Sequence, residues 1–194
     1  MATRDMMDWE TEICEVVSSA EEEEIIVRGH RLSELIGQTS FAGMMFLLLQ
    51  GRLPKENEAR VLDALLVASA EHGIAPPSMV ARCFSSYGTS IQAAVGGGIL
   101  AFGDRMGGLG EQLAKLMVER LPTDDGERRA LDGAGLSDLA AATVEHAYAS
   151  GERIPGYGIP LHGADPRAPA VLRIARQEGT FGEYCQFALA IEDA

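Results

Sequence analysis

A stretch rich in proline, glycine and charged residues, 152–167, is where the sequence is best suited to chemistry. Its prolines remove amide donors and fix φ, so no helix can continue through it. Its glycines let the backbone adopt positive φ or approach a ligand closely. Arg167 follows at a predicted helix start that Asp165 would cap, and its guanidinium fork suits a carboxylate. The alternative is an ordinary loop that ends in a common Asp-Pro helix start.

Two further segments carry residues that can bind anions or move protons. His72 precedes Gly73 at a predicted helix C-terminus, where the partial negative charge favours a protonated cap or a donor. On its own this reads as a helix-capping histidine. The string Gly-Asp-Arg-Met-Gly-Gly at residues 103–108 permits a tight turn into the next helix, whose N-terminal amides could face an anion or a thioester oxygen.

These strings resemble a known superfamily, that of citrate synthase and citryl-CoA lyase. The stretch 152–167 resembles the signature Pro-Gly-(Phe/Tyr)-Gly-His…Asp-Pro-Arg, and the string that ends at Pro54 resembles Leu-Leu-x-Gly-x-Leu-Pro. Residues 103–108 resemble Gly-Asp-Arg-Phe-Gly-Gly in the lyase domain of ATP-citrate lyase. Citrate synthases have a catalytic His where Met106 stands, so the resemblance is strongest to the short citryl-CoA lyase-like branch.

The resemblance implies that the protein forms or cleaves the C–C bond between acetyl-CoA, or another acyl-CoA, and oxaloacetate, as a transferase or a lyase. It implies that His72 is a catalytic residue and binds the substrate, together with Arg82 and Arg167. Coenzyme A enters as a substrate, without a metal. Its binding wall would be formed, mostly through main-chain contacts, by Arg153, Ile154, Gly156, Tyr157 and Gly158.

The sequence departs from the family pattern at two places. Ile159 stands where the family has a substrate His, and losing such a donor costs about 2.7–4 kcal/mol in a transition state. His162 lies nearby, either to fill the vacated place or to pack the loop. The family's catalytic Asp and its C-terminal helices are absent from these 194 residues, either because the chain is truncated or because the protein has given up that chemistry. The alternative function is therefore a catalytically impaired paralogue that binds coenzyme A or a dicarboxylate without turnover.

Composition limits the classes of partner. The net charge of −13 argues against nucleic acid and anionic membranes, and the longest apolar run, 41–49, is too short to cross a bilayer. The 3 cysteines are widely spaced in apolar surroundings, which favours buried, reduced thiols in a cytoplasmic protein. No Cys or His pair has the spacing of metal ligands.

Hydrophobic periodicity and turn signals predict an all-α chain after a short N-terminal β-hairpin with an acidic tip. The resemblance implies that these helices form a citrate-synthase-like fold with two domains. Residues 1–106 would form the large domain, and residues 107–194 a partial small domain with the substrate loop. The run 41–50 is apolar on every side and predicts a fully buried helix. Small residues within 90–102 suit close helix approach, and the resemblance implies a homodimer formed through this part of the fold.

Overall fold

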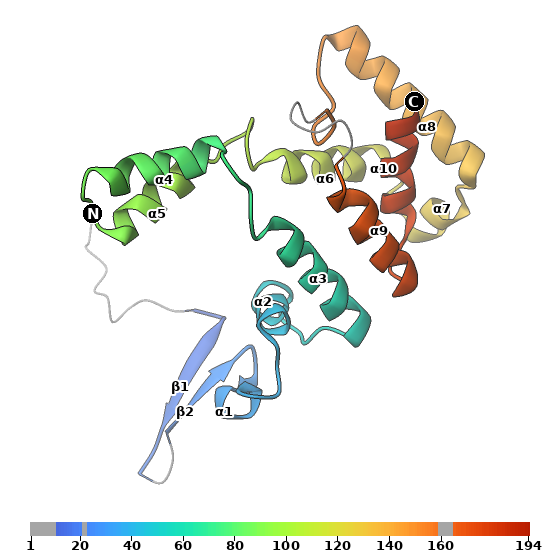
Figure 1. Cartoon of the computed structure of the whole chain (residues 1–194). Helices are drawn as coiled ribbons and strands as arrows, with labels where there is room; N and C mark the ends of the chain where they lie inside the picture. Colours follow the sequence, from blue (N-terminus) through green and yellow to red (C-terminus); the bar gives the residue numbers. More distant parts are fainter. Residues whose placement is uncertain (1–10, 21–22, 159–164) are drawn as a thin grey trace, which may run out of the picture. The chain divides into compact units, whose positions relative to one another are not determined.

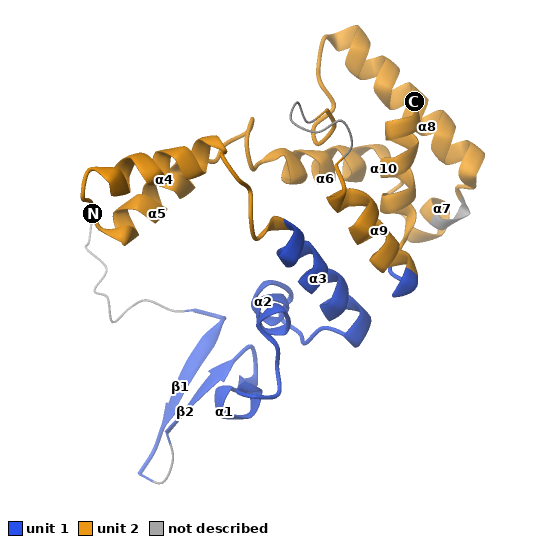
Figure 2. Cartoon of the chain, in the orientation of Figure 1, with its two compact units in different colours: residues 1–68, 177–180 blue, residues 69–176, 181–194 orange. Residues whose placement is uncertain are grey.

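A computed structural model of the chain describes residues 11–20, 23–158 and 165–194, with only the backbone of residues 129 and 130. The chain forms two compact units, one of residues 1–68 with 177–180 and one of residues 69–176 with 181–194 (Figure 2). The predicted division between residues 106 and 107 falls inside the second unit. That division stays a prediction, and each unit is described here by itself.

The first unit begins with a small antiparallel sheet (Figure 1). β1 (Cys14–Ser18) pairs with β2 (Glu23–Val27), which confirms the predicted hairpin, and β3 (His30–Arg31) extends the sheet. The turn between β2 and β3 consists of Arg28 and Gly29, with φ of 48° and 81°. Two successive residues at positive φ are typical of the type I′ turn, whose twist matches that of the paired strands.

Three helices follow in the first unit: α1 (Leu32–Leu35), α2 (Phe41–Gln50) and α3 (Glu56–Ser69). The bounds of α2 agree with the sequence signals. The hydroxyl of Ser40 accepts a hydrogen bond from the Gly43 amide at 3.0 Å, and Gly51, at φ 73°, ends the helix in the left-handed conformation.

The prediction that α2 is buried on every side is wrong. Leu47 is fully buried in a cluster with Val27 and Leu35, but Phe41 is 80% exposed and Leu49 is 73% exposed. The reason is that one side of the helix packs against the sheet and α1. A helix apolar all round needs cover all round, and the described part of the chain supplies it on one side.

The second unit is entirely helical in its described residues apart from isolated bridges in one turn. Its helices are α4 (Pro76–Ser86), α5 (Ile91–Leu100), α6 (Leu109–Arg120), α7 (Asp125–Ala130), α8 (Gly133–Ser150), α9 (Arg167–Gln177) and α10 (Glu183–Asp193). α4 and α5 form a hairpin (Figure 1). Its seam is tight, since a Cβ on Gly98 would lie 3.1 Å from the carbonyl oxygen of Pro77.

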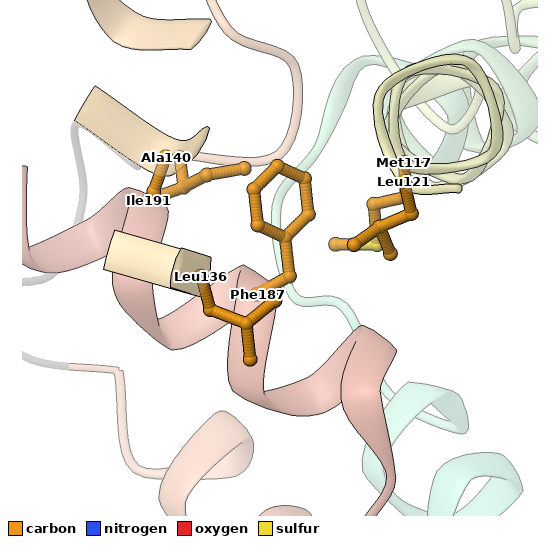
Figure 3. Close-up of a cluster of buried hydrophobic side chains, with 6 residues drawn as sticks. All are labelled: Met117, Leu121, Leu136, Ala140, Phe187 and Ile191. Carbon is orange, nitrogen blue, oxygen red and sulfur yellow. The ribbon is translucent and has the colours of Figure 1, made fainter. Parts of the chain in front are cut away.

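The main hydrophobic core of this unit lies among α6, α8 and α10. Phe187 of α10 is fully buried, with side chains of α6 and α8 around it (Figure 3). The buried members of this cluster are Met117, Leu121, Leu136, Ala140, Phe187 and Ile191. This core matters for the site because the substrate loop predicted from the sequence packs against it.

The expectation of buried cysteines is wrong for two of the three. Cys14 and Cys83 are exposed and Cys185 is half-buried, all three as free thiols. Apolar neighbours in sequence did not imply burial, because Cys14 lies on the outer strand β1, whose side chains are all exposed.

Candidate active site

Arg167 is the first residue of α9, and the Asp-Pro step before it fixes its position. The Asp165 carboxylate accepts a hydrogen bond from the backbone amide of Arg167 through Oδ1 at 2.9 Å. It thus satisfies the first amide of α9 from one residue before the N-cap position, which Pro166 occupies. The same carboxylate also pairs with the guanidinium. Nε donates to Oδ1 at 2.9 Å and to Oδ2 at 3.1 Å, and Nη2 donates to Oδ2 at 2.6 Å.

This pairing sets the electrostatics around Arg167. Hydrogen bonding to Asp165 raises the pKa of the Arg167 guanidinium, and the charges of Asp165 and, less strongly, Glu71 act in the same direction. Glu71 immediately precedes His72 in the sequence. The loop that carries His72 is therefore within electrostatic range of Arg167, which the sequence alone did not reveal.

His72 lies in the loop between α3 and α4, and its side chain is exposed. Because α3 ends at Ser69, the expectation that His72 caps the C-terminus of this helix is wrong. The loop backbone beside it is held by hydrogen bonds. The Gly73 amide donates to Glu71 Oε1 at 2.5 Å, and the Ser78 hydroxyl donates to the Gly73 carbonyl at 2.8 Å. The imidazole thus projects from a constrained backbone.

Arg82 belongs to α4 and lies at the edge of a shallow hollow. The hollow has a volume of about 420 Å³ and lies over α4, α5 and the start of the loop before α4. Gly73 and Ile74, which directly follow His72, line it together with Arg82. Most of its other lining residues are apolar. The structure therefore brings Arg82 and the two residues after His72 to one hollow, whereas His72 and Arg167 are not among its lining residues. That these three residues bind one substrate stays a prediction.

The predicted coenzyme-A wall, residues 153–158, is anchored by two of its side chains. Ile154 and Tyr157 are half-buried and pack against the core of α6, α8 and α10. The Tyr157 hydroxyl donates a hydrogen bond to the Ala188 carbonyl of α10 at 2.7 Å. Burial, with a smaller effect from the charge of Glu192, raises the pKa of Tyr157 to about 12.

The rest of the wall is open to solvent. Arg153, Gly156 and Gly158 are exposed. Gly156 has φ 88°, a conformation that favours glycine, and a Cβ there would lie 3.1 Å from the end of the Leu113 side chain. Gly158 has φ 80° with open space around it. The predictions for Ile159 and His162 fall on residues 159–164, outside the described part of the chain.

The segment 103–108 forms the tight turn that its glycines predicted. Gly103 and Met106 exchange backbone hydrogen bonds at 2.8 and 2.9 Å, and the Gly108 amide donates to the Gly103 carbonyl at 3.1 Å. A Cβ on Gly107, at φ 92°, would collide with the Phe102 ring. The next helix, α6, starts directly afterwards at Leu109.

Sequence reasoning missed two acidic contributors. It treated Asp165 as a helix cap alone and did not single out Glu71, although both carboxylates act on Arg167. The spacing of Asp165 and Arg167 was visible, but a pair two residues apart meets only when a turn folds the chain back at that point. In the described residues, no group of three or more His, Cys, Asp or Glu is arranged to hold a metal ion. No helix there is long and apolar enough to cross a membrane.

Comparison with known proteins relates the chain to one family. The family model described as citrate synthase, C-terminal domain, matches residues 54–194. The solved citryl-CoA lyase from Hydrogenobacter thermophilus is 34% identical, with a TM-score of 0.78. This likeness covers 96% of the present chain and 67% of the lyase chain. No protein of curated function matches the sequence.

Two more distant structures have the same fold. ATP citrate lyase from Methanothrix soehngenii, solved in complex with citrate and coenzyme A, is 20% identical with a TM-score of 0.77, covering 98% of this chain and 29% of that one. Citrate synthase from Thermotoga maritima is 15% identical with a TM-score of 0.53, covering 96% of this chain and 75% of that one. These likenesses confirm the predicted mostly helical, citrate-synthase-like fold.

Proposed function

Because the chain belongs to the citrate synthase family, we propose that it forms or cleaves the C–C bond between acetyl-CoA, or another acyl-CoA, and oxaloacetate. The likeness to citryl-CoA lyase at 34% identity favours a reaction of the lyase type. The observation that carries the proposal is the anchored loop at residues 153–158, which leaves Arg153 and Gly158 exposed shortly before the carboxylate-binding fork of Arg167.

The reaction sets clear chemical demands. In the cleavage direction a base removes the proton from the hydroxyl of citryl-CoA, the C–C bond breaks, and its electron pair becomes the enolate of acetyl-CoA. The hydroxyl carbon becomes the ketone of oxaloacetate, and the enolate carbon takes up a proton. Synthesis is the reverse. Such a site must hold carboxylates, move protons and stabilise charge on two oxygens.

His72, Arg82 and Arg167 are proposed to meet the demands at the dicarboxylate end. His72 is exposed on a loop whose backbone is constrained, so its imidazole can exchange a proton with the ketone or hydroxyl oxygen. Arg82 offers a positive charge at the hollow that Gly73 also lines. Arg167 offers the part of its guanidinium that Asp165 does not occupy to a substrate carboxylate.

Coenzyme A is proposed to lie along Arg153, Ile154, Gly156, Tyr157 and Gly158. The packing of the loop supports this placement. Ile154 and Tyr157 pack against the hydrophobic core, and the backbone of the glycines is exposed at the surface. A backbone without side chains can approach a ligand closely and donate its amides to it. Ile154 and Tyr157 then act by holding the wall in place.

We propose that the protein is a homodimer whose subunits meet through α4 and α5. α5 carries large apolar side chains at the surface outside the hollow, among them Ile99 at 62% and Leu100 at 86% exposure. An apolar surface of this kind marks an interaction site. A cytoplasmic location is proposed from the free thiols of the three cysteines, which suit a reducing compartment.

The second candidate is a protein that binds coenzyme A or a dicarboxylate without turnover. The observation that favours it is Ile159, an aliphatic residue where the family signature has a histidine. An aliphatic side chain cannot donate a hydrogen bond to a ketone or hydroxyl oxygen, and such a donor is worth about 2.7–4 kcal/mol in a transition state.

Two activity assays and a binding measurement separate the two candidates. Purified protein is mixed with citryl-CoA, and oxaloacetate release is followed; in a second assay, acetyl-CoA and oxaloacetate are mixed and free thiol is followed. Turnover by the wild type in either assay, lost in the His72→Ala variant, supports the hypothesis that the protein is an enzyme. Calorimetric binding of coenzyme A or oxaloacetate without turnover supports the binding protein, and no binding of either ligand contradicts both candidates.

A further inference from the structure

The Asp165–Arg167 pair has a geometry beyond that of a helix cap. A cap requires one hydrogen bond, which the Arg167 amide donates to Oδ1. Here the same carboxylate also receives three donor contacts from the guanidinium, between 2.6 and 3.1 Å. One short, half-buried side chain thus fixes both the start of α9 and the head group of its first residue.

The contacts use one particular edge of the guanidinium. A guanidinium has a side edge, made by Nε and Nη2, and an end edge, made by Nη1 and Nη2. Asp165 occupies the side edge with both of its oxygens. Within residues 11–20, 23–158 and 165–194, no hydrogen bond from Nη1 is found, and the Arg167 side chain is 35% exposed.

From this geometry we propose that Asp165 is a positioning residue, which holds the side edge of Arg167 so that the end edge faces the substrate carboxylate. The inference rests on the proposed function, since it assigns the free edge to the dicarboxylate. Arg167 touches the substrate, whereas Asp165 acts through Arg167.

Fixing the Arg167 side chain before the ligand binds favours binding through entropy. Ordering a long, rotamer-rich side chain when a ligand binds weakens the affinity by about three- to tenfold. A guanidinium that is already fixed avoids that loss, because its torsions are set before the ligand arrives. Pairing with Asp165 makes the Asp165–Arg167 pair neutral as a whole. The N–H groups of the end edge can still donate hydrogen bonds to a substrate carboxylate, because their direction is fixed by the guanidinium plane.

Two substitutions separate positioning from capping. Asp165→Asn keeps an oxygen that can accept from the Arg167 amide but removes the charge that pairs with the guanidinium. Asp165→Glu keeps the charge but moves it one methylene further, away from the capping position. If capping alone matters, Asp165→Glu is the damaging change. If positioning matters, Asp165→Asn is the damaging change.

The test combines a ligand-free signal with binding. The Nε–H resonance of Arg167, assigned by its loss in Arg167→Lys, is expected to be protected from solvent exchange in the wild type and in exchange in Asp165→Asn. Calorimetry is expected to give about tenfold weaker oxaloacetate binding in Asp165→Asn, with coenzyme-A affinity and melting temperature unchanged. Arg173→Gln, which removes a charge from an exposed position on the same helix, is the matched control and should bind as the wild type does.

The outcomes distinguish this inference from the proposed function. An Nε–H signal in free exchange in the wild type overturns the inference whatever the ligand data show. Equal or tighter oxaloacetate binding by Asp165→Asn overturns it as well. A protected signal in a wild-type protein that binds no oxaloacetate overturns the proposed function and the assignment of the free edge to a substrate, while the hold of Asp165 on Arg167 stands.

Discussion

The helices α6, α8 and α10 and the hairpin of α4 and α5 belong to the same unit, yet they bury apolar side chains to very different extents. In the first group Phe187 is 0% and Leu136 is 2% exposed. In the second, Ile91 is 74% and Leu100 is 86% exposed, and the buried residues are small or proline. Large apolar side chains are therefore buried in the first region and exposed in the second.

The difference follows from the number of helices that meet. Three helices can surround a side chain such as Phe187 and remove it from water on all sides. Two helices share a single seam, and glycines at that seam bring their axes close instead of filling a core. Burying a large apolar side chain is worth about 1.5–3 kcal/mol, so the outward residues of α4 and α5 retain a strong tendency to associate.

The largest expected effect tests the self-contained core. Phe187→Ala should lower the free energy of unfolding by about 3–5 kcal/mol, because it removes a fully buried ring and leaves a cavity among α6, α8 and α10. Chemical denaturation measures this change. Tyr148→Ala on α8 is the control, since its ring is 86% exposed and its loss should change stability by less than about 0.5 kcal/mol. Equal effects would mean that the core is not where the structure places it.

The second prediction concerns the α4–α5 surface. The double change Ile99→Glu and Leu100→Glu should weaken self-association at least about 100-fold. These side chains are 62% and 86% exposed in one subunit, and the substitutions would place two charged side chains at the proposed dimer interface. Light scattering after size-exclusion chromatography measures the mass over a range of concentrations. Tyr148→Glu, an exposed aromatic on α8, should leave the mass unchanged. A wild-type protein that is monomeric at all concentrations would contradict the proposed dimer.

The third prediction tests the seam of the hairpin with two neighbouring glycines of α5. Gly98→Ala should be less stable than Gly96→Ala by about 1–3 kcal/mol, since both gain the same helix propensity but only the first crowds the chain. A Cβ at Gly98 would lie 3.1 Å from the Pro77 carbonyl oxygen, whereas one at Gly96 meets nothing within 4 Å. Thermal unfolding of the two variants at one protein concentration measures the difference, and equal stability would show that the seam can open.

The smallest effect is expected where the substrate loop meets the core. Tyr157→Phe keeps the ring and removes its hydrogen bond to the Ala188 carbonyl, which should cost about 1 kcal/mol in unfolding free energy. Coenzyme-A affinity should fall modestly as the loop loosens. Calorimetry and denaturation at neutral pH measure both quantities. Unchanged stability together with lost coenzyme-A binding would instead indicate that the hydroxyl contacts the ligand directly.

The same variant has a pH signature. The pKa of Tyr157 is raised to about 12 by burial and by Glu192, above the value near 10 of an unfolded tyrosine. The folded state holds this proton more tightly, so the stability it contributes is complete below about pH 10 and is lost as the pH rises toward 12. The stability advantage of the wild type over Tyr157→Phe should therefore shrink as the pH rises from about 10 toward 12.

Much of the local structure was predictable from particular residues. The helix predicted for the run 41–50 has the bounds of α2, and the predicted N-terminal hairpin is formed by β1 and β2. The loop at residues 153–158 and Arg167 were singled out by their resemblance to a family motif, and their role in substrate binding stays a prediction. Burial was predicted less well. The sequence suggested a buried α2 and buried cysteines, but which side of an element is covered depends on neighbours distant in sequence.

By itself, the sequence determined the order of the helices, the turns at Gly73, Gly107 and Gly156, and the residue types available for carboxylate binding, because caps, positive φ and ionisable groups are local properties. Only the tertiary structure decided that Tyr157 is anchored to Ala188, that Asp165 holds one edge of Arg167, and that α4 and α5 keep their apolar sides uncovered. These facts depend on where the folded backbone brings atoms together.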